Sequence, residues 1–216
     1  MQGKFITLEG GEGVGKSTQA RRIKEELGRR GIEVVLVREP GGTPLAEEIR
    51  RLLKDYSADA PNARAELMLF LAARAQLVEN VIKPALAAGK WVVSDRFSDS
   101  TIAYQGYGRG LDVDAIRRLD AFARGGLSPD LTLLFVVDAQ EALRRRRGRE
   151  IATSTSADRF ESAGDAFHAR LERGFDAIAA AEPERVKRID ASGSPDEVWG
   201  KVAKEIFDLR FFDFSI

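Results

Sequence analysis

The chain of 216 residues contains no cysteine. This absence excludes disulfide bonds, thiolate metal sites and a cysteine nucleophile together. An excess of charge of one sign is also missing, because lysine plus arginine and aspartate plus glutamate both number 34. Proteins that bind long nucleic acid usually carry surplus positive charge, so we expect a small anionic partner and no long nucleic acid.

Long hydrophobic runs are missing as well. No stretch approaches the roughly 20 apolar residues that a membrane-spanning helix needs. Residues 1–4 lead directly into a short apolar run, without the features of a signal peptide. We therefore expect a cytoplasmic protein with no membrane partner. No linker divides the chain convincingly, so residues 1–216 are predicted to form a single domain.

The apolar residues that are present follow two alternating patterns. Short runs rich in branched residues predict strands, and longer stretches at helical period predict helices between them. This alternation is typical of an α/β protein whose parallel sheet is covered by helices on both faces. The predicted strands are 4–9, 33–37, 91–94, 131–137 and 186–190. The predicted helices are 16–30, 44–54, 63–88, 98–106, 113–124, 139–147, 165–181 and 195–208.

A glycine-rich stretch follows the first predicted strand. Residues 10–17, GGEGVGKS, fit the spacing G-x-x-x-x-G-K-[ST] of a phosphate-binding loop. Glycines let successive backbone N–H groups converge on phosphate oxygens, Lys16 adds a charge for the β and γ phosphates, and the hydroxyl of Ser17 suits magnesium. A simple glycine-rich turn is the alternative. The strand before the loop and the helix after it favour nucleotide binding.

Charged residues also follow the third predicted strand. Asp95 is placed to hold magnesium or its waters opposite Ser17, and the planar guanidinium of Arg96 suits a second phosphate. The alternative is an Asp-Arg pair that only caps the next helix. A carboxylate that holds a metal, beside an arginine that binds an anion, favours a kinase whose acceptor is itself phosphorylated. A GTPase is disfavoured, because neither asparagine of the chain, Asn62 or Asn80, begins the sequence N-K-x-D that reads guanine.

Two further groups of residues are ambiguous by themselves. Phe70 and Arg74 share one helix face and suit a nucleobase, but Phe70 also extends an apolar stripe, so core packing is favoured on this pattern alone. Arginines 144–147 and 149 precede a polar stretch at 148–158. Behind a phosphate-binding loop, this arrangement favours a mobile lid over a nucleic-acid tail.

Together these stretches resemble the bacterial thymidylate kinases, from residue 4 to about residue 206. The resemblance rests on Leu8-Glu9-Gly10 before the loop, REPGGT at 38–43, ELMLFLAARAQ at 66–76, DRF at 95–97 with YQG at 104–106, and DRFE at 158–161. It implies a P-loop nucleoside monophosphate kinase fold with a five-stranded parallel sheet, a lid at about 147–160 and a homodimer. It also implies transfer of the γ-phosphoryl group of MgATP to dTMP. Another nucleoside monophosphate or a deoxynucleoside as acceptor, and a non-catalytic ATP sensor, remain alternatives.

The resemblance also implies roles for individual residues. The implied catalytic residues are Glu9, Lys16, Arg96 and Arg149, with Arg145 or Arg147 as replacements for Arg149; a lid arginine is implied because Gly13 stands where some relatives have a basic residue. The implied ATP-binding residues are Gly10, Gly11, Glu12, Gly13, Val14, Gly15, Lys16, Ser17 and Thr18. Magnesium would be held by Ser17 and Asp95, with Glu9 nearby. The implied acceptor-binding residues are Glu39, Pro40, Arg50, Phe70, Arg74, Arg96, Ser100, Thr101, Tyr104 and Gln105.

Three segments carry weaker expectations. Residues 190–194 resemble the family's loop near adenine, where main-chain contacts are expected. Phe211, Phe212 and Phe214 depart from the usual family ending; packing on their own domain is the alternative to a dimer or partner contact. The single histidine, His168, is expected to lie at the surface or in helix packing, because this type of transfer depends on positioning and charge.

Overall fold

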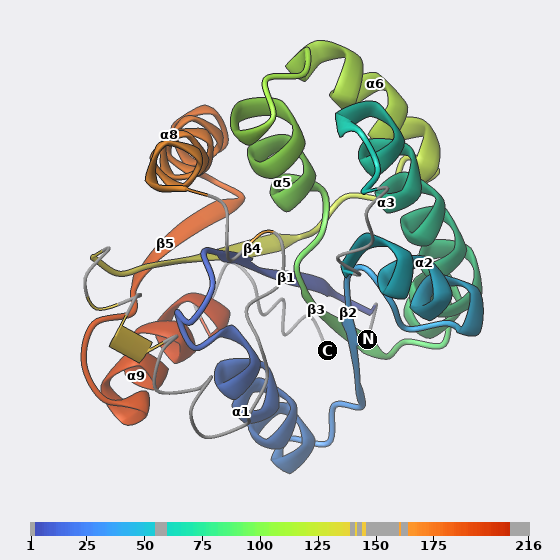
Figure 1. Ribbon diagram of the computed structural model, residues 1–216. Coiled ribbons are helices and arrows are strands. Elements are labelled where there is room, and N and C mark those ends of the chain that lie inside the picture. The colour runs from blue at the N-terminus through green and yellow to red at the C-terminus, as the bar shows by residue number, and fades with distance from the viewer. Residues whose placement is uncertain are drawn as a thin grey trace.

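The computed structural model describes residues 3–54, 60–138, 141, 144–145, 160 and 164–207. Its five strands pair in parallel in the order β2-β3-β1-β4-β5 (Figure 1). The strands are β1 (Phe5–Gly10), β2 (Val34–Arg38), β3 (Trp91–Asp95), β4 (Leu131–Val136) and β5 (Val186–Asp190). The predicted five-stranded parallel sheet is confirmed, and every predicted strand end lies within one residue of the observed end.

The helices connect these strands on both sides of the sheet. They are α1 (Lys16–Arg29), α2 (Pro44–Lys54), α3 (Ala63–Leu77), α4 (Lys83–Ala87), α5 (Ser98–Thr101), α6 (Val113–Ala123), α8 (Asp165–Ala181) and α9 (Pro195–Ile206). Two predicted helices contain a π-helical segment: η1 (Val78–Ile82) continues α3, and η2 (Ile102–Gly108) continues α5. Such segments occur often at functional sites. The helix predicted at 139–147, the lid and residues 208–216 lie outside the described residues, apart from residues 141, 144–145 and 160.

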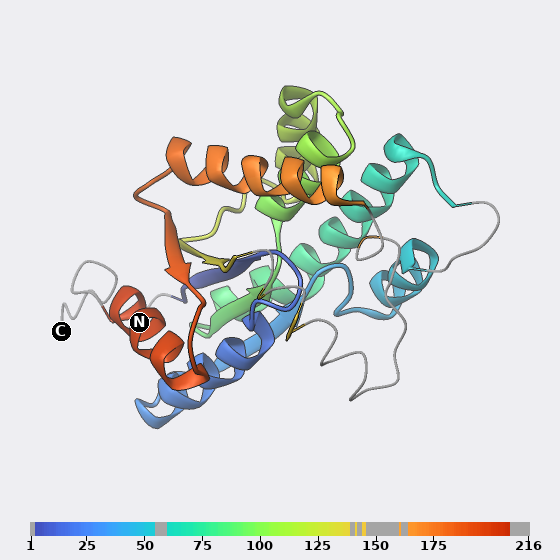
Figure 2. The same ribbon diagram turned by 60° about the vertical axis from the view of Figure 1, so that its left-hand side comes forward.

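The two faces of the sheet bury different residues of β1. Ile6 and Leu8 pack with α1 and α9 on one face, where Ile23 and Val202 are fully buried. Residues at the alternate positions, beginning with Phe5, point to the opposite face, as the period of two in a strand requires. Figures 1 and 2 show α1 and α9 below the sheet and α5, α6 and α8 above it. The prediction that helices cover both faces is therefore confirmed.

This arrangement gathers the ends of three neighbouring strands, β2, β3 and β1, at one edge of the sheet. Leu8 of β1 and Arg38 of β2 both align with Asp95 of β3, so the residues after these strands lie beside one another. Ligands of open parallel sheets bind beyond this carboxyl edge. None of the described helices is long and apolar enough to cross a membrane. The single domain and the cytoplasmic location stay predictions.

Candidate active site

The loop between β1 and α1 is shaped by glycines. Gly10 has a φ of 124°, and a Cβ there would lie 2.3 Å from the carbonyl oxygen of Phe135 in β4, so only glycine fits. Gly15 has a φ of 92° and precedes the first residue of α1. A Cβ at Gly11 or Gly15 would meet nothing within 4 Å. The loop thus packs tightly against the sheet at its beginning and is open where a ligand would approach.

Lys16 folds back over this loop. Its Nζ donates to the carbonyl oxygens of Gly10 at 3.2 Å and Gly11 at 2.6 Å. Burial lowers the pKa of Lys16 to about 8, and the positive charge of Arg96 acts in the same direction, although nearby carboxylates oppose it. Lys16 is therefore a desolvated cation beside a second cation, and an anion at this place would stabilise both.

Ser17 and Asp95 lie together, as predicted. The Ser17 hydroxyl donates to Asp95 Oδ2 at 2.8 Å, although 78 residues separate them in sequence. Among the described residues no group of three or more His, Cys, Asp or Glu could hold a metal ion. A pair of oxygen ligands fits Mg²⁺, because this ion keeps several waters and usually takes only one or two protein oxygens together with substrate phosphates.

The backbone of Arg96 turns sharply after β3. Arg96 has a φ of 74°, and no other non-glycine residue in the described part of the chain has a positive φ. Such a conformation costs a bulky residue about 1–3 kcal/mol and persists only where surrounding contacts enforce it. Here the Arg96 N–H donates to the carbonyl of Leu8 at 3.0 Å, and the Ser94 hydroxyl donates to the Arg96 carbonyl at 2.6 Å.

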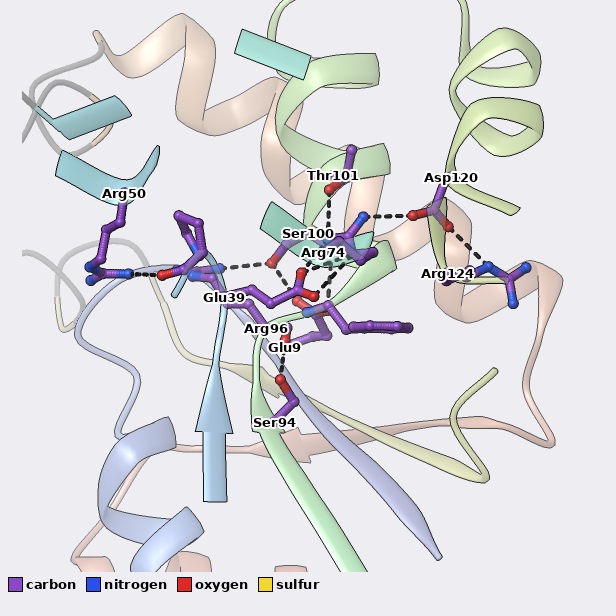
Figure 3. Close-up of polar contacts among 12 residues, drawn as sticks. Glu9, Glu39, Arg50, Arg74, Ser94, Arg96, Ser100, Thr101, Asp120 and Arg124 are labelled. Carbon is purple, nitrogen blue, oxygen red and sulfur yellow. Dashed lines mark hydrogen bonds and ion pairs between the residues drawn. The ribbon is translucent and has the colours of Figure 1, made fainter. Parts of the chain in front are cut away.

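The side chain of Arg96 joins the phosphate-binding loop to α5 (Figure 3). Its Nη1 donates to the Gly10 carbonyl at 2.9 Å and to the Ser100 hydroxyl at 3.0 Å. Its Nη2 pairs with Glu12 at 2.5 Å, and the guanidinium carbon lies 5.1 Å from the centre of the Tyr104 ring. Four predicted site residues are thereby brought around one guanidinium.

The side chain of Glu9, from β1, is fully buried beside the first residues of α5. Its Oε1 accepts from the backbone N–H of Phe97 at 2.8 Å and of Ser100 at 3.2 Å, and its Oε2 accepts from the Ser100 hydroxyl at 2.5 Å. Burial raises the pKa of Glu9 to about 7, with a further rise from the negative charge of Asp99, while Ser100, Arg96 and the Phe97 N–H oppose the rise. The carboxyl group therefore changes its charge near neutral pH.

Arg74 is almost completely buried, with 1% of its surface exposed, and is surrounded by side chains from α5, α6 and the loop after β2. Its Nε donates to Glu39 Oε2 at 2.9 Å, and its Nη2 also pairs with Glu39. Its Nη1 donates to Asp120 at 2.6 Å, and its Nη2 donates to Thr101 at 3.0 Å. Burial raises the pKa of Glu39, although Arg74 opposes the rise. Three predicted acceptor residues thus lie together, because Arg74 is bonded to both Glu39 and Thr101 (Figure 3).

The other predicted acceptor residues surround this ion-pair network. The Arg50 guanidinium donates to the Pro40 carbonyl at 2.7 Å. Phe70 makes an edge contact with Phe160 at 5.9 Å between ring centres, and Tyr104 contacts the same ring at 6.0 Å.

Gln105 lies in the same region and donates to the buried carboxylate of Glu66 at 2.7 Å. Whether these side chains contact a substrate stays a prediction. Arg149 lies outside the described residues.

A cleft of about 450 Å³ opens beside the phosphate-binding loop. Its lining includes Gly13, Val14, Gly15 and Thr18, all predicted to bind ATP, together with Gln19, Glu141, Arg144, Arg145, Gly193, Pro195 and Val198. Arg145 donates to the carbonyls of Ala191 at 2.9 Å and Gly193 at 3.2 Å. The loop expected near adenine is thus next to the phosphate-binding loop, and an arginine of the predicted cluster holds it.

Sequence reasoning missed two residues of the site. Asp120 was not selected, although it falls in the buried stripe of α6 with Ile116 and Ala123, and a charge in such a stripe is a usable signal. Ser94 gave no signal, because a serine inside an apolar strand has no distinctive pattern. Its importance depends on the turn that follows.

Comparisons with known proteins identify the family. The family model described as thymidylate kinase matches residues 8–202. A thymidylate kinase of Rhizorhabdus wittichii is 52% identical over 209 residues, covering 97% of this chain and 99% of that protein. One from a Synechococcus species is 50% identical over 198 residues, or 92% of either protein. The crystal structure of thymidylate kinase from Ehrlichia chaffeensis has a TM-score of 0.74 and 35% identity, covering 95% of this chain and 99% of that one. The chain therefore belongs to the thymidylate kinase family.

Proposed function

We propose that the protein transfers the γ-phosphoryl group of MgATP to dTMP, giving dTDP and ADP. One observation carries the proposal: Lys16 and Arg96 both donate to the carbonyl oxygen of Gly10. Lys16 is buried and Arg96 is partly buried, so the two cations that meet at this oxygen repel each other and form a site for phosphate groups. The family supplies the identity of the acceptor, because the relatives named above are thymidylate kinases.

On the donor side, the backbone N–H groups of residues 11–16 surround the β and γ phosphates, and Lys16 moves its ammonium group from the loop carbonyls to these oxygens. Ser17 and Asp95 would hold magnesium, since both present oxygen atoms within 2.8 Å of each other. When bound, magnesium neutralises charge on the β and γ phosphate oxygens. The adenine enters the cleft that Arg145 and Gly193 help to line.

On the acceptor side, Arg96 binds the phosphate of dTMP and turns one oxygen toward the γ-phosphorus. A bond forms between that oxygen and the γ-phosphorus while the bond to the β–γ bridging oxygen breaks, and ADP leaves with the electron pair. Glu9 lies beside Arg96 and Ser100 and fixes the beginning of α5. Little covalent chemistry is required of the protein, so positioning and charge neutralisation provide the rate.

The base of dTMP is assigned to the region around Phe70, Arg74 and Gln105, with Tyr104 against the deoxyribose. The lid, with Arg149 as the preferred arginine, closes over the phosphates and excludes water. Closure matters because water that enters an open site could attack the γ phosphate and hydrolyse ATP.

The test is ADP release with dTMP, dUMP, UMP, CMP, AMP and thymidine as acceptors, under equal ATP and magnesium. We expect the highest kcat/KM with dTMP. A preference for another monophosphate would replace dTMP as the substrate, and efficient use of thymidine would point to a nucleoside kinase. ATP binding without acceptor-dependent ADP release would identify a non-catalytic sensor.

We also propose that the protein is a homodimer. Large apolar side chains are exposed on three neighbouring helices, α2, α3 and α6, which lie together in Figure 1. The exposed residues are Leu45, Leu52, Met68, Leu119 and Phe122. An apolar face of this kind suits a second copy of the chain. Light scattering after gel filtration tests this: Phe122→Asp should yield monomers, the exposed-site control Lys24→Glu should not, and a monomeric wild type would refute it.

A further inference from the structure

The turn at Arg96 is a constrained backbone position within the site. A left-handed conformation is normally given to glycine, because a Cβ makes it unfavourable. This chain places its candidate phosphate clamp there, with a φ of 74°. The conformation must therefore be maintained by neighbouring groups, and these can be identified.

Hydrogen bonds of three backbone groups fix the chain around the turn, two of them to other backbone groups and one to a carboxylate. The Asp95 carbonyl accepts from the Glu39 N–H at 3.0 Å, the Arg96 N–H donates to Leu8 at 3.0 Å, and the Phe97 N–H donates to Glu9 at 2.8 Å. The group that remains is the Arg96 carbonyl, which accepts the Ser94 hydroxyl at 2.6 Å (Figure 3). Ser94 is completely buried, so water cannot readily replace its hydroxyl.

We propose that Ser94 is a positioning residue: its hydroxyl holds the Arg96 carbonyl and thereby maintains the left-handed turn that directs the Arg96 guanidinium to the acceptor phosphate. The inference rests on the function proposed above. Without this hydrogen bond the turn relaxes toward a negative φ, which swings the Cα–Cβ bond of Arg96. The guanidinium then leaves the place where it bonds to Gly10 and Ser100.

The hydrogen bond of Ser94 is a local one, made to the backbone of the turn and not to a ligand. Ser94 donates to the backbone of the residue two positions ahead, which is a local contact that competes with regular strand geometry. It therefore ends β3 and forms the turn in one step. A role confined to stability would affect every ligand equally, whereas a role through Arg96 affects only ligands that carry the acceptor phosphate.

The experiment compares Ser94→Ala with the matched control Ser98→Ala. Ser98 lies two residues on the other side of Arg96, and its buried hydroxyl has no hydrogen-bond partner among the described residues. Calorimetry measures the affinity of each variant for dTMP, for thymidine and for ATP. We expect Ser94→Ala to bind dTMP about tenfold more weakly, the loss typical of one buried hydrogen bond. Thymidine and ATP affinities should stay unchanged, as should all affinities of Ser98→Ala.

A double-mutant cycle with Arg96→Ala tests whether Ser94 acts through Arg96. In that background Ser94→Ala should cause no further loss of dTMP affinity, because the guanidinium is already gone. Ser94→Cys, which retains a weak donor, serves if the alanine variant does not fold; it should weaken dTMP binding by a smaller factor.

Three results would overturn the role of Ser94 without touching the proposed function. The first is equal loss of dTMP and thymidine affinity in Ser94→Ala, and the second is a full effect of Ser94→Ala in the Arg96→Ala background. The third is a Ser94→Ala variant that binds dTMP as well as the wild-type protein does. If the wild-type protein does not bind dTMP, the proposed function itself fails.

Discussion

The donor and acceptor halves of the candidate site are built from different kinds of groups. The donor half is mainly backbone: a glycine-rich loop, one lysine and one serine within eight consecutive residues. The acceptor half consists of buried side chains whose partners are far apart in sequence. Arg74 pairs with Glu39 across 35 residues and with Asp120 across 46, and Glu9 accepts from Ser100 across 91.

This difference has a physical consequence. Apart from Gly10, which packs against β4, and Val14, which is buried in the core, the loop is open, so changes at its other positions should affect binding of phosphates more than folding. The acceptor half places ionised groups in a region nearly without water, where each charge depends on its partner. Changes there should affect folding and substrate binding together, unless the altered group faces the ligand directly.

Arg96 lies where the two halves meet and should show the largest effect. We expect Arg96→Ala to lower kcat/KM for dTMP by about 10³-fold, the range for removing a group that neutralises transferring phosphoryl charge. The KM for ATP should change much less. Arg96→Lys keeps the charge but loses the planar fork, so it should recover only part of the loss. Steady-state ADP release measures this, and near-normal turnover by Arg96→Ala would defeat the clamp assignment.

The next effect tests whether the acceptor half is also a folding element. Asp120→Ala leaves Arg74 without one of its two carboxylates, and we expect a loss of about 3–5 kcal/mol in the free energy of unfolding. The control Asp176→Ala removes a carboxylate that is 58% exposed and pairs with Arg188; it should cost about 1 kcal/mol or less. Urea denaturation gives both values. Equal losses would mean that the buried network is no more important than a surface pair.

The same comparison explains what the sequence could predict. The fold follows from short apolar strands and helical periodicity, so the strands and most helices were predicted closely. The π-helical segments η1 and η2 were not, because an inserted residue shifts the apolar pattern by one position, and such a shift does not stand out in segments this short.

In the candidate site, Lys16 and Ser17 were predicted from spacing because their functional neighbours are adjacent in sequence. Glu39 and Arg74 were predicted as acceptor residues, but nothing in the sequence indicates that they bind each other. That pairing depends on how α3 packs beside the loop after β2, and a long-range contact of this kind has no local signature. Asp120 could have been found from its position in an apolar helix stripe.

Glu9 gives a pH dependence that separates activity from stability. Its pKa is raised from 4.5 to about 7, so the folded protein favours the protonated carboxyl. The stability that Glu9 contributes is therefore complete below pH 4.5 and is lost as the pH rises through about 7. Activity should run the other way, because the ionised carboxylate accepts all three hydrogen bonds that hold the beginning of α5.

We expect kcat/KM for dTMP to fall about tenfold per pH unit below 7 and to be level above it. The phosphate of dTMP itself titrates near pH 6, so Glu9→Gln is the control. Glu9→Gln should remove the fall of kcat/KM near pH 7 and leave only the fall that comes from titration of the dTMP phosphate. An unchanged profile in Glu9→Gln would show that Glu9 does not control the rate.

Phe70 tests the part of the acceptor half that faces the base. Phe70 is only partly buried, and its recorded ring contact is with Phe160, so its removal should spare the charge network. We expect Phe70→Ala to raise the KM for dTMP about tenfold with little change in kcat, the magnitude of a lost base–aromatic stack. Phe70→Tyr should retain most affinity. If Phe70→Ala lowers stability but leaves the KM unchanged, Phe70 is a core residue only.

Arg145 tests the donor half from the opposite side and should show the smallest effect. Its guanidinium bonds to the carbonyls of Ala191 and Gly193 and pairs with Glu141, so it shapes the cleft assigned to adenine. Because Arg145 is itself partly exposed and one of the residues that it supports, Gly193, is exposed, its removal should raise the KM for ATP only about two- to threefold, within the range of a partly exposed ion pair. The KM for dTMP and the free energy of unfolding should not change.

Arg144→Ala is the matched control, since Arg144 pairs with the same glutamate but is 75% exposed. A loss of dTMP affinity in Arg145→Ala equal to the loss of ATP affinity would contradict the separation of the two halves, because it would place a donor-side arginine in control of the acceptor.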